Sequence, residues 1–474
     1  MSRESALLKN TFIYAMGNFS SKLLSVILLP FYTYYLSTSD FGYFDLILTA
    51  SSMLTPIISF QISDGLYRFL LDAKGEDEKQ QVISTAFLIA IKNIIFTNII
   101  FIIILNSITE LRYGYLIMLQ IDFSILSALW AQTSRGIRDN VGYSVSGVLA
   151  TTVLLFSNIS LIMFTNMRVD ALVISTILSN VVVLGYLEFR LGLRHYIKFH
   201  NLNRSLRTAL YKYSLPLVPN LLSWWLMSLS DRFIIVHYLG MEANGIYAVA
   251  NKFPSMLILI YSIFNLAWQD SAISEYNSKD RNAFYTRLFN KLLVLQFTTV
   301  FMLLSFTKPI MNLLISYTFS DAWFYVPFLY IGALFSNFSS FYGTGYVSSK
   351  ETNGAFYTSI AGATVNIILN FILIEKMGIQ AASVSTMLAF FVMWVARVYQ
   401  TRKYLKITII PKNIVGYGLL LGVFTYLYYV NTFYVQISMG ALALIIFLLS
   451  NRELVFGVIK LLRQRSSGRR KNDD

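Results

Sequence analysis

The chain has 474 residues, of which 56% are hydrophobic and only 13% are charged. Soluble globular chains average about 45–50% apolar and about 25% charged residues, so this composition excludes a disordered chain and argues against a soluble enzyme. The net charge of +14 would suit nucleic acid or the anionic surface of a membrane. The absence of cysteine excludes disulfides, thiolate nucleophiles and Cys-ligated metals.

Apolar runs follow one another along the whole chain. A helix that crosses a bilayer needs about 20 mainly apolar residues. The first run is too long for a cleaved signal peptide, contains Lys22 and lacks a small-residue cleavage site. We therefore predict an all-α integral membrane protein with fourteen spans, at residues 12–36, 44–63, 82–105, 115–133, 143–165, 171–189, 215–239, 246–268, 289–306, 323–345, 356–374, 379–399, 414–430 and 434–449.

The loops between these spans carry very unequal charge. If the N-terminus is cytoplasmic, thirty Lys and Arg residues lie on the inner side. The outer side then has four: Arg112, Arg168, Lys308 and Lys376. The positive-inside rule places both termini in the cytoplasm. It also explains most of the net charge, so we expect the lipid bilayer as a partner and no nucleic acid.

The two halves of the chain align without a gap at an offset of 203 residues. Gly42 then matches Gly245, and the tripeptide Ser52-Met53-Leu54 matches Ser255-Met256-Leu257. Six spans separate the copies, which predicts a parallel repeat about an axis along the membrane normal. We expect two six-helix bundles around a central cavity, at residues 1–200 and 201–406. Residues 407–474 would add two transmembrane helices and a basic cytoplasmic tail.

Lys291 and Arg397 lie within three residues of a predicted span end and are counted with the inner loops, and four further basic residues fall inside predicted spans. At about 3 kcal/mol each, four lipid-facing charges would cost about 12 kcal/mol, so each should face a cavity or a partner. Lys22 has no evident acid at its depth, which makes it the foremost candidate for contact with an anionic cargo. The substrate-binding candidates are Lys22, Lys252, Arg232 and Lys92.

Polar side chains at helical spacing predict faces that line the cavity. The chosen positions are Asn18, Ser25, Asn251 and Asn366. Three acids serve either ion coupling or structural pairing: Asp231 beside Arg232 or Lys252, Asp122 across from Lys92, and Asp64. Trp224, Trp225, Tyr14 and Tyr261 offer flat faces for sugar rings, with helix packing as the alternative role.

The sequence lacks the features of an enzyme. It has no G-x-x-x-x-G-K-[ST] motif, which excludes a P-loop ATPase site. The predicted outer loops are too short for a catalytic domain. His195, His200 and His237 are scattered along the chain and predict no metal site. We expect no catalytic residue, no metal and no cofactor.

Several motifs identify a family. They are Ser230-Asp231-Arg232-Phe233-Ile234-Ile235, the run Gly245 to Lys252 (GIYAVANK), Ala267-Trp268-Gln269-Asp270 and Asp64-Gly65-Leu66-Tyr67-Arg68-Phe69. With the fourteen spans, they resemble the polysaccharide-transport family of the multidrug/oligosaccharidyl-lipid/polysaccharide exporter superfamily. The resemblance covers essentially the whole chain.

This resemblance implies a flippase in a bacterial cell membrane. The expected cargo is an undecaprenyl-diphosphate-linked oligosaccharide repeat unit of exopolysaccharide, capsule or O-antigen type, carried to the outer leaflet by alternating access. Polysaccharide polymerase and other glycan assembly proteins are the implied partners. The alternatives are a cation-coupled multidrug exporter of the same fold, a flippase for a peptidoglycan precursor, and a membrane enzyme.

Overall fold

The computed structural model describes residues 27–107, 113–198, 203–274, 276, 278–349, 353–403, 405–430, 432–453 and 455–456. Most of the first predicted span lies outside these ranges, and with it Lys22, Asn18 and Ser25. Within them the regular elements are α-helices and short 3-10 helices, with no strand. The predicted all-helical class is therefore confirmed.

The chain separates into two compact units, Met1–Ala248 and Val249–Asp474. Residues 27–35 are helical. The other elements that begin in the first unit are α2 (Thr38–Ser59), α3 (Ile62–Asp72), α4 (Glu76–Ser107), α5 (Gly114–Gly136), α6 (Asn140–Phe164), α7 (Val169–Leu191), η1 (Leu193–Tyr196), α8 (Arg204–Ser214) and α9 (Leu217–Ser274). The predicted bundle boundary at residues 200 and 201 differs from this division and remains a prediction.

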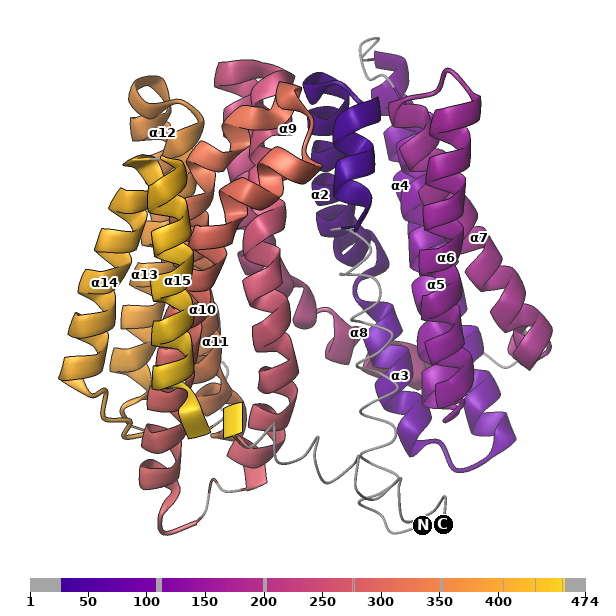
Figure 1. Ribbon diagram of the computed structural model, residues 1–474. Helices are drawn as coiled ribbons and strands as arrows, with labels where there is room; N and C mark the ends of the chain where they lie inside the picture. The colour runs from indigo at the N-terminus through magenta and orange to yellow at the C-terminus, as the bar shows by residue number, and fades with distance from the viewer. Residues whose placement is uncertain are drawn as a thin grey trace, which may run out of the picture. The chain divides into compact units, whose positions relative to one another are not determined.

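The second unit continues from the end of α9. Its further elements are α10 (Arg281–Leu314), η2 (Tyr317–Tyr325), α11 (Val326–Ser348), α12 (Asn353–Met377), α13 (Ile379–Thr401), α14 (Pro411–Val430) and α15 (Phe433–Ser450). Within this unit α13 packs against both α11 and α12, and α10 packs against α14 and α15. Figure 1 shows α14 and α15 in yellow beside α10.

The helices occupy the predicted spans from 44–63 onward. Eleven helices of the described chain are long and apolar enough to cross a membrane, and the apolar part of α15 is shorter. These helices indicate a multi-pass membrane protein. The count of fourteen remains a prediction, because the first span is mostly undescribed and α9 covers two predicted spans.

Gly240 divides α9 into those two spans. A continuous helix of 58 residues would be about 87 Å long, far more than the roughly 30 Å of a bilayer core. Gly240 has φ 87° and ψ 176°, a conformation that glycine alone adopts readily. The break lies between the predicted span ends at residues 239 and 246, so the sequence located the two spans correctly.

The first unit has an apolar core between α3, α4, α5 and α8. Ile62 and Leu66 of α3, Ala86 of α4 and Leu210 of α8 are all fully buried there. The opposite faces of the long helices are also apolar, with many exposed Ile, Leu, Val and Phe side chains. Apolar residues on both the inner and the outer faces are expected of helices that contact lipid.

Two glycines allow α2 and the start of the second span of α9 to touch through their backbones. A Cβ atom at Gly42 would overlap the carbonyl oxygen of Met241, and one at Gly245 would overlap the carbonyl oxygen of Thr38. Asn244 Nδ2 donates a hydrogen bond of 2.7 Å to the Gly42 carbonyl oxygen beside this contact. Glycine at both positions is therefore a steric requirement.

We predict that Gly42→Ala destabilises the protein by about 1–3 kcal/mol, because a backbone carbonyl cannot move aside as a side chain can. The matched control is Gly147→Ala in α6, where an added Cβ would meet nothing within 4 Å. Thermal unfolding of the purified proteins in detergent measures the difference. Equal midpoints for the two variants would contradict the requirement at Gly42.

Candidate functional site

A polar cavity lies among the membrane-spanning helices of the first unit. Its volume is about 470 Å³, within the range of small-molecule sites. We call it the hydroxyl pocket, after the residues that line it: Leu48, Ser51, Ser52, Thr55, Pro56, Ser59, Gln61, Ile62, Ser63, Gln120, Ser124, Ile125, Ala128, Leu129, Thr176, Leu221 and Trp225. None of these lining residues is charged.

A break between α2 and α3 shapes one wall of this pocket. Phe60 and Gln61 both have positive φ, 51° and 55°, which is uncommon for residues with a Cβ. Pro56 lies one turn before the break, and its carbonyl oxygen accepts a hydrogen bond from Gln61 N at 3.2 Å. Backbone strain of this kind concentrates at functional sites. Residues 44–63 are predicted as one span that Pro56 would kink, and the structure divides them into two helices, α2 and α3.

Two buried polar atoms of the hydroxyl pocket have no hydrogen-bond partner among the described residues. They are Ser51 Oγ, on α2, and Gln120 Oε1, on α5. A buried polar group without a partner costs about 1–3 kcal/mol. Both residues line the cavity, although the two atoms themselves are covered by protein.

Trp225 adds an aromatic surface to the same pocket. The sequence analysis named Trp225 as a flat face for a sugar ring, and the structure places it among serine, threonine and glutamine side chains. An aromatic face beside many neutral hydrogen-bonding groups suits a carbohydrate, whose ring combines apolar C–H faces with peripheral hydroxyls.

A buried ion pair joins α2 to α9 in the same unit. Arg232 Nε donates to Asp45 Oδ2 at 2.6 Å, and the side chains are only 11% and 8% exposed. The Arg232 guanidinium also lies 5.8 Å from the centre of the Tyr247 ring. Asp45 was not singled out in the sequence analysis. Asp45 is the second residue of the predicted span 44–63. An acid inside a span was the available sign that it needs a partner.

Asp231, the neighbour of Arg232, has a different partner. It is buried, and its Oδ2 accepts a hydrogen bond of 2.9 Å from the Tyr247 hydroxyl. Tyr247 therefore contacts both charged residues of the Asp231-Arg232 motif. The family motif thus builds a buried polar cluster together with Asp45.

The other predicted site residues of the first unit lie apart from one another. Asp122 Oδ2 accepts from Asn98 Nδ2 at 2.8 Å, so the pairing of Asp122 with Lys92 is wrong. Asp64 Oδ2 accepts from Gln61 Nε2 at 2.8 Å, next to the α2–α3 break. Lys92 lines a separate pocket between α4 and α8.

The predicted residues of the second unit belong mainly to helix packing. Lys252 and Asn251 are half-buried on α9. Asn366 of α12 is fully buried and donates to Thr386 Oγ1 of α13 at 3.2 Å. Asn366 therefore faces α13. A hydrogen-bonding partner on a neighbouring helix satisfies this side chain as a polar cavity would.

Two cations assigned to loops are buried in the second unit. The Arg397 guanidinium, on α13, donates to Thr358 Oγ1, Ser359 Oγ and the Ser339 carbonyl oxygen at 3.0–3.1 Å. Lys308, on α10, places its Nζ 3.2 Å from the centre of the Trp323 ring. Burial was predicted for neither residue, because each lies close to the end of a predicted span.

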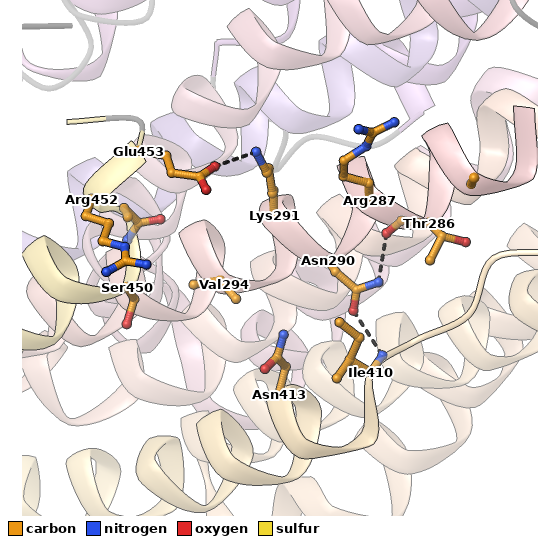
Figure 2. Close-up of a pocket in the computed structure, with 12 residues that line it drawn as sticks. Thr286, Arg287, Asn290, Lys291, Val294, Ile410, Asn413, Ser450, Arg452 and Glu453 are labelled. Atoms are coloured by element: carbon orange, nitrogen blue, oxygen red, sulfur yellow. Dashed lines mark hydrogen bonds and ion pairs between the residues drawn. The ribbon is translucent and has the colours of Figure 1, made fainter. Parts of the chain in front are cut away.

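A larger cavity, the C-terminal pocket, lies between α10, α14 and the end of α15. Its volume is about 900 Å³ (Figure 2). Lys291 and Glu453 form an ion pair of 2.8 Å across it. Asn290 is buried and donates to the Thr286 and Thr408 carbonyl oxygens, while its Oδ1 accepts from Ile410 N. These contacts hold the segment before α14 against α10. The residues of this pocket therefore have a structural role in helix packing.

Comparison with known proteins defines the relationship of the chain. The model of the family described as "Polysaccharide biosynthesis protein" matches residues 7–268. An uncharacterized membrane protein of Methanocaldococcus jannaschii is 22% identical over 422 residues, which cover 81% of this chain and 82% of that protein.

Two solved structures share the fold. A structure described as the lipid II flippase MurJ in an inward closed conformation has a TM-score of 0.71 and 15% identity, and the match covers 94% of this chain and 100% of that one. An inward-facing multidrug resistance transporter of the MATE family has a TM-score of 0.68 and 13% identity, covering 82% and 98% of the chains. The second belongs to the MOP superfamily by its description.

We predict that Asp45→Asn lowers the free energy of unfolding by about 3–5 kcal/mol, because it leaves the Arg232 charge buried without its carboxylate. The double variant Asp45→Asn/Arg232→Met removes both charges and should recover most of the loss. Immunoblots of membranes and thermal unfolding in detergent report the two effects. A double variant less stable than Asp45→Asn would refute this role of the pair.

For the C-terminal pocket, Asn290→Ala should cost about 1–3 kcal/mol through the unsatisfied backbone groups it leaves. Asn413→Ala is the matched control, since the Asn413 side chain lines the same pocket without a hydrogen bond to the described residues. Unfolding midpoints of the two variants decide the matter. A loss in Asn413→Ala as large as in Asn290→Ala would reject the assignment.

Proposed function

Because the chain belongs to the family of polysaccharide biosynthesis proteins, we propose that it is a flippase for undecaprenyl-diphosphate-linked oligosaccharide repeat units. It moves units of exopolysaccharide, capsule or O-antigen type from the cytoplasmic to the outer leaflet. Family and fold are those of transporters and flippases, and the proposed transport needs no catalytic residue, metal or cofactor.

The hydroxyl pocket is the observation that carries this proposal. It places Ser51, Gln120 and Trp225 around a cavity of about 470 Å³ within membrane-spanning helices. Neutral hydrogen-bonding groups lower the cost of desolvating sugar hydroxyls during passage through the membrane.

Alternating access follows from the proposed repeat. At the offset of 203 residues, Thr38 corresponds to Met241 and Gly42 to Gly245. The Gly42 contact with the Met241 carbonyl is therefore the counterpart of the Gly245 contact with the Thr38 carbonyl. Reciprocal contacts of this kind arise at a twofold axis. They support a parallel repeat of two six-helix bundles, residues 1–200 and 201–406, with residues 407–474 as an addition.

We place the protein in a bacterial cell membrane with both termini in the cytoplasm, as the loop charges indicate. The partners are the lipid-linked oligosaccharide, polysaccharide polymerase and other glycan assembly proteins. The membrane potential drives part of the export, because moving one charge through 100 mV is worth about 2.3 kcal/mol and the diphosphate is anionic.

Two related functions are the alternatives. A peptidoglycan-precursor flippase is suggested by the likeness to MurJ. A cation-coupled multidrug exporter is suggested by the likeness to the MATE transporter. Against the exporter, no carboxylate lines the hydroxyl pocket in the described chain.

We predict that Trp225→Ala lowers the rate of flipping about 5- to 150-fold, since loss of one stacking face is worth about 1–3 kcal/mol. Trp130→Ala, on α5 outside the pocket, is the matched control. The assay follows a fluorescent lipid-linked oligosaccharide in proteoliposomes, with immunoblots to confirm equal incorporation. Flipping at the wild-type rate in Trp225→Ala would rule out this pocket as the sugar site.

A further inference from the structure

A second polar cavity of the first unit is strongly basic. It has a volume of about 410 Å³ and lies between α4 and α8. We call it the basic pocket. Its lining residues are Thr85, Leu88, Ile89 and Lys92 of α4, Asn203 before α8, and Arg204, Arg207 and Tyr211 of α8. Three of the eight are cations, and none is an acid.

These three cations have no partner of their own. Among the described residues, no hydrogen bond or ion pair engages the side chains of Lys92, Arg204 or Arg207. Asp122, the acid that the sequence suggested as a partner of Lys92, is bonded to Asn98. Three like charges around one cavity repel each other, and Lys92 lies within a spanning helix. An anion in the pocket would relieve both costs.

The local structure of α8 holds its two arginines toward the pocket. Asn203 caps the helix, with Oδ1 accepting from the backbone nitrogens of Ser205 at 2.9 Å and Leu206 at 3.4 Å. Leu210 is fully buried in the core with α3 and α4, which fixes the rotation of α8. Arg204, Arg207 and Tyr211 follow at intervals of three and four and therefore share a face.

An exposed apolar stripe begins at Lys92 and runs along α4 away from its N-terminal end. Ile95, Phe96, Ile99 and Ile103 are 55%, 64%, 55% and 61% exposed. They follow Lys92 at helical spacing, so the stripe extends about 16 Å from it. A cationic pocket at the foot of a lipid-facing stripe matches an amphiphile with an anionic head and a hydrocarbon chain.

We propose that the basic pocket binds the diphosphate of a polyprenyl-linked lipid, with the polyprenyl chain along the α4 stripe. The proposal rests on the proposed function and names where the cargo lipid first docks. The number of charges favours a diphosphate over a simple phospholipid. A diphosphate diester carries two negative charges opposite the three cations, whereas phosphatidylglycerol carries one. Guanidinium groups bind phosphate oxygens in bidentate geometry, and the ammonium of Lys92 adds a point charge.

Binding of undecaprenyl diphosphate to the purified full-length protein in detergent tests the proposal, by native mass spectrometry. Arg204→Gln/Arg207→Gln and, separately, Lys92→Met should each weaken binding at least about tenfold, as expected for lost charge-assisted hydrogen bonds. Lys92→Met keeps α4 apolar and should fold normally, which a thermal unfolding midpoint verifies. Lys92→Arg should retain binding.

The matched control is Lys279→Gln/Lys412→Gln. It removes the same charge from exposed lysines that do not line the basic pocket. Wild-type affinity in this control, with loss in the pocket variants, supports the site. Equal losses in both would overturn it, as would wild-type affinity in Arg204→Gln/Arg207→Gln.

Competing ligands test which class of anion the basic pocket binds. Phosphatidylglycerol, with a single negative charge, should bind at least about tenfold more weakly than undecaprenyl diphosphate, and inorganic diphosphate should not displace it at equal concentration. Equal binding of phosphatidylglycerol, or full displacement by inorganic diphosphate, would overturn the assignment. If the wild type binds the lipid through these cations but flips no oligosaccharide in proteoliposomes, the docking site stands and the proposed function fails. If the wild type flips the oligosaccharide but lipid binding does not depend on these cations, the proposed function stands and the docking site fails.

Discussion

A charge inside a bilayer needs a partner, and this constraint organises the molecule. Arg232 meets Asp45, the Arg397 guanidinium meets two hydroxyls and a carbonyl, and Lys308 rests on the ring of Trp323. The contacts of Arg232 and Arg397 tie together segments far apart in sequence, and that of Lys308 joins α10 to η2. The intramembrane charges thus fix which helices are neighbours, while the apolar surface fixes only that they are buried or face lipid.

The two polar cavities of the first unit differ in chemistry as the two parts of a glycolipid differ. The hydroxyl pocket is neutral and contains Trp225, whereas the basic pocket is cationic and adjoins an apolar stripe. If the cations and the neutral hydroxyl and amide groups lined one cavity, the cations would form hydrogen bonds with those groups. In the proposed scheme, separate pockets would keep the cations available for phosphate.

Sequence reasoning predicted the helices well because hydrophobic length is a local property. It located the boundary within α9 because Gly240 and the polar residues after it interrupt an apolar run. The partners of the charges were harder, because pairing depends on packing between distant segments. Asp122 illustrates this: depth along the helices suggested Lys92, but Asn98 is its partner. Trp225 lines the hydroxyl pocket, and its role as a face for a sugar ring stays a prediction. Asp45, the second residue of the predicted span 44–63, was overlooked.

The reciprocal contact at Gly42 and Gly245 has a consequence for the ancestry of the fold. Each glycine meets the carbonyl four residues before the other glycine. Two separate copies of a half-length polypeptide could make the same pair of contacts across a true dimer axis. The duplication would then need no new interface, because fusion of two identical genes would preserve one that already existed. Later divergence could place Asp45 and Arg232 at positions whose counterparts, Ala248 and Leu29, are uncharged.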